Sequence, residues 1–143
     1  MKKSACPVPK IVIILMVVYG FGSLIHFIHN AEFLESYPNL PSSWTPSGVY
    51  MAWVGLTCVG ALGLFVLSKG YRWAGLLILM VYAALGVDSL GHYFVAELCE
   101  HTLGMNITIF MEVIPAAMLL FAVVGMLMQD LARKVSTRIG NAV

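Results

Sequence analysis

Charged side chains are scarce in this chain: Asp, Glu, Lys and Arg make up only 10% of its 143 residues. Soluble globular domains contain about 25% charged residues on average. Hydrophobic residues account for 60% of the chain, and its mean hydropathy is +0.90. This composition excludes an ordinary soluble domain and indicates an integral membrane protein. The formal net charge is only +1, and we expect the lipid bilayer, and no nucleic acid, as a partner.

The apolar residues are gathered in four runs, each close to or above the ~18 to 20 residues that cross a hydrocarbon core about 30 Å thick. The runs cover residues 11–28, 49–67, 73–90 and 103–128. The sequence therefore predicts an all-α fold, a four-transmembrane-helix bundle that forms a single domain over residues 1–143. We expect the helices at about 11–30, 48–68, 72–95 and 103–129.

Lysine and arginine are missing from two of the predicted loops, residues 30–47 and 95–102. All eight basic residues lie before the first helix, between the second and third, or after the fourth: Lys2, Lys3, Lys10, Lys69, Arg72, Arg133, Lys134 and Arg138. Cytoplasmic segments of membrane proteins carry an excess of these residues. The pattern predicts that both termini and the 68–72 link are cytoplasmic, with the protein in a bacterial inner membrane and the two other loops on its outer side.

Cysteine is rare as well, with three residues in the chain. The predicted topology puts Cys6 on the cytoplasmic side, Cys58 within the second helix and Cys99 in an outer loop. Because no two of them share a compartment, we expect no disulfide within the chain.

Ionisable side chains occur only in the outer halves of the predicted helices, and such groups at membrane depth usually mark a functional site. His26 and His29, three residues apart, are neighbours on one side of the first helix. Asp88 and His92, four residues apart, share one face of the third helix, where we expect them to pair. Glu112 is the only acid of the fourth helix. Together they predict a His/carboxylate pocket that opens to the outer side, lined by the first, third and fourth helices.

Two asparagines and a proline add to this pocket. Pro115 leaves the carbonyl of Met111 without its usual donor, and an opening of the helix beside Glu112 suits the lining of a cavity. Asn30 and Asn106 are the other polar residues in the same part of the bundle. We therefore predict Asn30, Asn106 and Glu112 as ligand-binding residues.

One interpretation of the pocket is a transition-metal site. Imidazole and carboxylate groups suit Zn, Cu or Fe, and helix bundles build such sites from side chains on facing helices. His101 and Glu112 would lie ~16 Å apart on one straight helix and could not share an ion. The predicted metal ligands are therefore His26, His29, Asp88 and His92.

A second interpretation is acid–base chemistry on, or binding of, an apolar small molecule that enters from the bilayer. Its catalytic groups would be His26, Asp88 and Glu112. A third is that these groups only form interhelical hydrogen bonds, in a homo-oligomer or in an accessory structural subunit of a larger membrane complex. The residues leave all three interpretations open, and with them the question whether the protein is an enzyme.

Three segments bear on the second interpretation: FGSLIHFIHNAEF, YAALGVDSLGHYFVAELCEH and MNITIFMEVIPAAMLL. In order, they resemble the polar segments of the EXPERA family, which includes sterol isomerases and the emopamil-binding and sigma-2-type proteins. The resemblance implies a four-helix membrane core that isomerises or binds sterol-like and other apolar ligands. It gives His26 the family's histidine, Asp88 its acidic position and Asn106 its polar position on the last helix. Asn30 stands where the family has an acid after the histidine, and the second helix has no carboxylate.

Overall fold

The computed structural model describes residues 8–140, and all regular structure within this range is helical. The α-helices are α1 (Lys10–Glu32), α2 (Pro46–Ser68), α3 (Arg72–Val87), α4 (His92–Val95) and α5 (Leu103–Gly140). Short 3₁₀ turns lie between them: η1 (Leu34–Ser36), η2 (Asp88–Gly91) and η3 (Leu98–Glu100). Lys2, Lys3 and Cys6, which carry part of the topology and cysteine predictions, lie outside the described residues.

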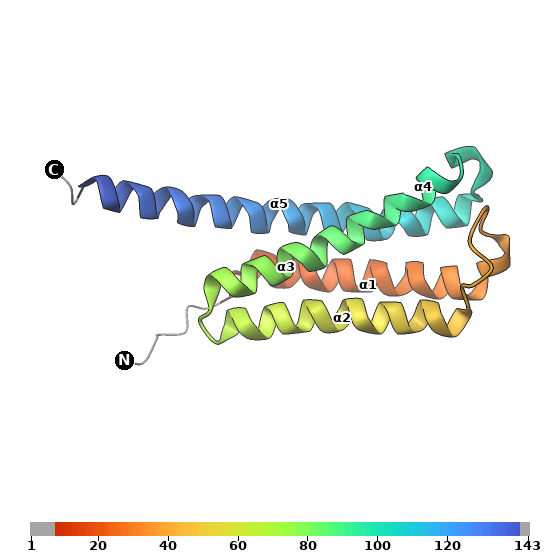
Figure 1. Cartoon of the computed structure of the whole chain (residues 1–143), viewed down its shortest axis with the longest axis horizontal. Coiled ribbons are helices and arrows are strands. Elements are labelled where there is room, and N and C mark those ends of the chain that lie inside the picture. Colours follow the sequence, from red (N-terminus) through yellow and green to blue (C-terminus); the bar gives the residue numbers. More distant parts are fainter. Residues whose placement is uncertain (1–7, 141–143) are drawn as a thin grey trace.

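Four segments are long and apolar enough to cross a membrane: α1, α2, α5 and the helical run Arg72–Val95, which joins α3, η2 and α4. They lie side by side along the long axis of the molecule (Figure 1). α1 packs mainly on α5, α2 on α3, and α3 on α5. For the described part of the chain, the prediction of an all-α fold with four long apolar helices is confirmed.

The ends of α2 follow from local sequence. Its N-terminus is capped by the Thr45 hydroxyl, which accepts a 3.1 Å hydrogen bond from the N–H of Gly48, and Pro46 stands at the first helical position. At the other end, Gly70 adopts φ +84°, a left-handed conformation that glycine enters without steric cost. The chain therefore turns at once from α2 into α3, and these two helices are antiparallel neighbours.

α1 and α5 come into main-chain contact at Gly22. A Cβ on Gly22 would overlap the carbonyl oxygen of Met111 and lie 2.9 Å from its carbonyl carbon. Pro115 has no N–H, so this same carbonyl receives no bond from the next turn of α5. The contact also sets the register of the two helices, since it brings His26, one turn after Gly22, to the level of Glu112.

Two helix ends differ from the prediction by more than two residues. The third helix does not continue as an α-helix to residue 95, because η2 changes to 3₁₀ geometry over Asp88–Gly91. Its sequence, DSLG, contains Asp, Ser and Gly, which are weak helix formers. The fourth helix was expected to end at 129, whereas α5 continues to Gly140. The apolar run ends near 129, but residues 129–140 contain good helix formers and no proline, so the helix itself does not end there.

The two ends of the bundle carry opposite charge. The start of α1, the α2–α3 turn and the last turns of α5 lie at one end (Figure 1), which holds Lys10, Lys69, Arg72, Arg133, Lys134 and Arg138. The other end holds Glu32, Glu35, Glu97 and Glu100, and none of the described Lys or Arg residues. We call these the basic end and the acidic end.

Candidate functional site

A pocket of about 350 Å³ lies at the acidic end, and we call it the histidine pocket. Its polar lining consists of His26 and Asn30 from α1, Asp88 and Ser89 from η2, and His92 from α4. The remaining wall is mostly apolar and includes Phe27, Leu40, Pro41, Trp44, Val49, Leu85 and Val95. The pocket therefore lies between α1, the first loop, the start of α2 and the α3–α4 run. α5, which was expected to line it, stands behind it.

His26 and Glu112 meet behind the pocket, and their side chains are only 2% and 0% exposed. His26 Nε2 lies 3.7 Å from Glu112 Oε2, and His26 Nδ1 lies 3.4 Å from the Thr108 hydroxyl. The same Glu112 oxygen accepts a 2.6 Å hydrogen bond from Ser89 Oγ. Glu112 thus contacts two of the side chains that line the pocket, one from α1 and one from η2, and fixes both from behind.

Several buried polar atoms next to this contact have no hydrogen-bond partner within residues 8–140. They include Glu112 Oε1, Ser23 Oγ and Asn30 Oδ1. A buried polar atom without a partner costs roughly 1–3 kcal/mol, and native proteins contain few of them. Of these three residues, only Asn30 lines the pocket, so its Oδ1 is available to a polar group of a bound molecule.

Three of the four histidines of the chain lie around Tyr37, a residue of the first loop. The Tyr37 ring centroid lies 5.9 Å from that of His29, 5.1 Å from that of His92 and 6.5 Å from that of His101. The His92 centroid lies in turn 5.4 Å from that of His26. Burial raises the pKa of Tyr37 to about 12. The phenol therefore keeps its proton at neutral pH and can donate it to His29 Nδ1, 3.0 Å away.

The sequence prediction assigned no site role to Tyr37 or His101. His101 is only 5% exposed, so its side chain lies in the interior of the acidic end. Its Nδ1 lies 2.9 Å from the carbonyl oxygen of Glu97, and its Nε2 is buried with no partner in the described chain. Both residues lie in or beside loops, and hydropathy does not reveal the path of a loop. Only the structure shows that the two loops meet over the pocket.

The predicted Asp88–His92 pair does not form among the described residues. In the 3₁₀ geometry of η2, side chains four residues apart are rotated by about 120°, compared with about 40° in an α-helix. His92 Nε2 instead lies 3.5 Å from Asn30 Nδ2. The carboxylate of Asp88 lines the histidine pocket and makes no hydrogen bond or ion pair within residues 8–140.

The four predicted metal ligands do not form one group in this structure. His26 and His92 are close, but His29 bonds to Tyr37 in the first loop. Within the described residues, no three His, Cys, Asp or Glu side chains are placed to hold one metal ion. Of the predicted catalytic residues, His26 and Glu112 are in contact, and Asp88 lines the pocket beside His26.

Asn106 holds the second loop in place and does not line the histidine pocket. Its Nδ2 donates to the carbonyl oxygens of Leu98 and His101, at 3.2 and 3.3 Å, and its Oδ1 accepts a 2.8 Å hydrogen bond from the Tyr93 hydroxyl. On its other side it borders an apolar groove of about 590 Å³ between α1 and α5. We call this the α1/α5 groove.

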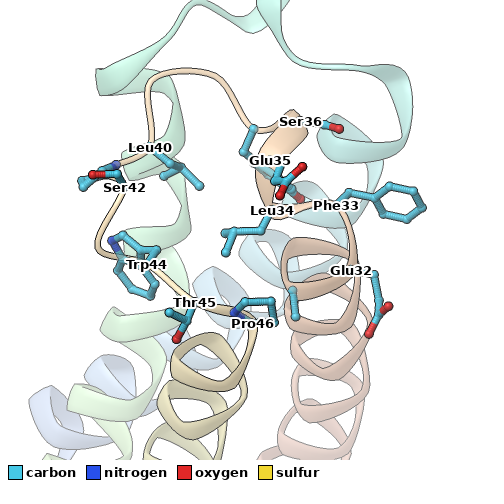
Figure 2. A pocket seen from close by; sticks show the side chains of 13 residues that line it. Glu32, Phe33, Leu34, Glu35, Ser36, Leu40, Ser42, Trp44, Thr45 and Pro46 are labelled. Carbon is cyan, nitrogen blue, oxygen red and sulfur yellow. The ribbon is translucent and has the colours of Figure 1, made fainter.

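The first loop, residues 33–45, forms one wall of the histidine pocket. Figure 2 shows the loop leaving the end of α1 and returning to the start of α2, with Leu40 directed into the hollow beneath it. This hollow, of about 510 Å³, shares Leu40, Pro41 and Trp44 with the histidine pocket. Asn39 Nδ2 ties the loop to the end of α4 through a 2.9 Å hydrogen bond to the carbonyl oxygen of Val95.

No protein-family model, curated protein or solved structure matches the chain. The chemistry of the site therefore has to be argued from its own side chains. They offer a mostly apolar chamber with one unpaired carboxylate on its wall and a buried histidine that contacts a buried carboxylate. Such a chamber can bind a small molecule with a polar group and can exchange a proton with it.

Proposed function

We propose that the protein is an integral membrane protein that binds a small molecule in the histidine pocket, on the outer side of the membrane. Four apolar helical segments of sufficient length support the membrane location. The division of charge between the two ends supports the orientation, because Lys and Arg are enriched in cytoplasmic segments. In this orientation the basic end faces the cytoplasm and the acidic end faces outward.

The observation that carries this proposal is the unpaired carboxylate of Asp88 on the wall of a mostly apolar pocket. Asp88 is exposed, so a ligand can meet its carboxylate directly, and the described chain has no Lys or Arg at the acidic end to neutralise it. The pocket therefore suits a neutral or positively charged molecule that donates hydrogen bonds, and it disfavours an anion. Its volume of about 350 Å³ is in the ~300–1,000 Å³ range of small-molecule sites.

The polar groups divide into two roles in this proposal. Asp88 and the side-chain oxygen of Asn30 accept hydrogen bonds from the ligand, while Phe27 and Trp44 cover its apolar part. If the protein is an enzyme, its acid–base group is His26 with Glu112 behind it, and the His26 ring must turn Nδ1 away from Thr108 to reach the ligand. In a binding protein without catalysis, the same contact fixes the wall of the pocket.

A second candidate function is binding of an apolar, sterol-like molecule, which the α1/α5 groove favours. The groove opens toward the lipid side of the bundle, and its lining is nearly all apolar: Val18, Phe21, Gly22, Leu103, Ile107, Phe110, Met111, Ile114 and Pro115, with Asn106 at its edge. This candidate agrees with the EXPERA resemblance. If this candidate is right, binding of the apolar molecule depends on Phe21, a residue of the groove, and not on Asp88.

Thermal unfolding of the purified protein in detergent separates these candidates, because a ligand that binds only the folded state raises the melting temperature. The probes are phenethylamine, its neutral analogue phenethyl alcohol, the anion phenylacetate, and cholesterol. We expect the amine to stabilise the wild type most and phenylacetate not at all. Asp88→Asn should lose this effect, while Glu97→Gln, which removes an exposed carboxylate of the second loop, should keep it.

Three outcomes would contradict the proposal. Stabilisation by phenylacetate alone, or by the amine equally in the Asp88→Asn variant, would show that Asp88 does not select the ligand. Stabilisation by cholesterol alone, lost in Phe21→Ala, would favour the second candidate. A stoichiometric metal found by elemental analysis and lost in both His26→Ala and His92→Ala would favour the metal interpretation.

Reporters fused after Val143 and within residues 38–46 test the topology and should lie in opposite compartments.

A further inference from the structure

α5 carries an exposed apolar stripe from Ile107 to Val135. Five of its residues follow one another at intervals of seven: Ile107, Ile114, Phe121, Met128 and Val135. Three large apolar residues follow members of this series by three positions: Phe110, Val124 and Leu131. All eight are between 36% and 76% exposed in the described chain. We call them the heptad stripe, since a spacing of three and four residues that continues for four heptads is the pattern of a coiled-coil seam.

Lipid can cover the part of this stripe that lies in a membrane, but α5 extends beyond it. Two contacts mark the level at which α5 leaves the bundle: Arg72 Nε donates to Asp130 at 2.6 Å, and the Lys134 ammonium lies 4.3 Å from the ring centroid of Trp73. Both contacts join α5 to the first turn of α3. They hold the next turns of α5 in line with the bundle (Figure 1), so these turns do not lie flat on a lipid surface.

The exposed apolar face continues past this level. Val135 lies about 7 Å and Ile139 about 13 Å beyond Asp130 along the helix axis, and they are 50% and 62% exposed. The headgroup layer of a bilayer is roughly 5–8 Å thick on each side. Val135 therefore lies at the edge of this layer and Ile139 outside it, where water would meet both side chains unless protein covers them.

Most charges of this segment lie away from the stripe, and Arg138, seven residues after Leu131, is the one that falls on it. Lys134 contacts Trp73, and Arg133 and Thr137 lie on the side opposite Val135, since neighbouring residues of an α-helix are rotated by about 100°. Gly125, beside the stripe, has nothing within 4 Å of its Cβ position in the described chain. A second helix can therefore approach closely without meeting a like charge before Arg138.

We propose that the heptad stripe pairs α5 with α5 of a second copy of this chain. Both copies have the same orientation in the membrane, so the pair is a parallel, two-fold symmetric coiled coil that runs from the bilayer into the cytoplasm. A second copy fits better than another partner because its heptad stripe has the same seven-residue register as the first and also continues to Val135. The inference rests on the proposed membrane location and orientation, and it does not depend on the histidine pocket.

Cysteine cross-linking in native membranes tests the pairing. Cys6, Cys58 and Cys99 are first replaced by alanine in the full-length chain, and one cysteine is then introduced as Val135→Cys or, as matched control, Thr137→Cys. Both side chains are exposed and two residues apart, but they face opposite sides of α5. With copper phenanthroline as oxidant, we expect a disulfide-linked dimer at least tenfold more abundant for Val135→Cys. Equal yields at the two positions, or no dimer at either, would overturn the proposal.

The mass of the protein in nanodiscs is the second measurement. We expect two copies per particle for the wild type, and one copy for a Leu131→Glu, Val135→Glu double variant that keeps its helix content. One copy for the wild type would also overturn the pairing. Fractionation and the ligand-induced melting shift are followed on the same samples. A monomer that still gains stability from the amine refutes only the dimer, whereas protein recovered in the soluble fraction refutes the membrane location.

Discussion

Replacing Gly22 by alanine tests how closely α1 and α5 must lie. The added Cβ would meet the carbonyl group of Met111, and main-chain atoms cannot rotate away as the end of a flexible side chain can. Overpacking of a tight contact costs about 1–3 kcal/mol, and a main-chain obstacle places this variant at the upper limit. Alanine in a helix interior is about 1 kcal/mol better than glycine, which offsets part of the loss. We therefore expect a net destabilisation of about 2 kcal/mol.

Gly55→Ala is the matched control for this variant. It makes the same substitution inside α2, where a Cβ would have nothing within 4 Å in the described chain, so only the gain in helix propensity remains. In a thermal melt, about 1 kcal/mol corresponds to roughly 4 °C for a protein of this size. We expect Gly22→Ala to melt several degrees below the wild type and Gly55→Ala no lower than it. If both variants melted at the same temperature, the close approach of α1 and α5 would be wrong.

Three further predictions follow from single contacts. Asn106→Ala should accelerate amide hydrogen exchange in residues 96–102 well before it lowers global stability, because two of its side-chain hydrogen bonds hold this loop and the third holds Tyr93 just before it. Asp130→Asn should cost no more than about 1 kcal/mol, because its partner Arg72 is 34% exposed, and this cost should nearly vanish in about 1 M salt. The pKa of Tyr37 is raised to about 12, above the value of about 10 in an unfolded chain. The unfolded state therefore loses this proton first, and stability falls as the pH rises from 10 to 12. Tyr37→Phe should show a smaller fall in a melting series over this range.

The sequence predicted the long helices because the length of an apolar run is a local property. It also identified two deep polar side chains, because His26 and Glu112 are ionisable groups within apolar runs. The structure brings these two side chains into contact. The spacing rule failed at Asp88 and His92, where the prediction assumed α-helical geometry across a segment that is a 3₁₀ turn. Three weak helix formers in DSLG gave a hint of this change, but periodicity alone does not show it.

The parts of the site that come from loops could not be predicted. Tyr37 lies in a segment rich in proline, and nothing in its neighbours indicates that it turns back over His29 and His92. His101 follows two glutamates of the second loop, Glu97 and Glu100, yet this loop folds inward and buries it. Asn106 was predicted as a ligand-binding residue, and the structure uses its side chain to hold that loop. In each case a long-range contact, and not a pattern along one helix, decides what the residue does.

Gly22 and Pro115 both act on the carbonyl group of Met111, so the effect of a substitution at one should depend on the residue at the other. Pro115 withholds a helical hydrogen bond from this carbonyl, and Gly22 of α1 leaves room for it. Pro115→Ala would supply the missing N–H and draw the carbonyl back toward the axis of α5, away from α1. Gly22→Ala should then be less harmful in a Pro115→Ala background than in the wild type. A double-mutant cycle over these two positions should accordingly give a coupling of about 1 kcal/mol, within the 0.5–3 kcal/mol found for residues that share a contact.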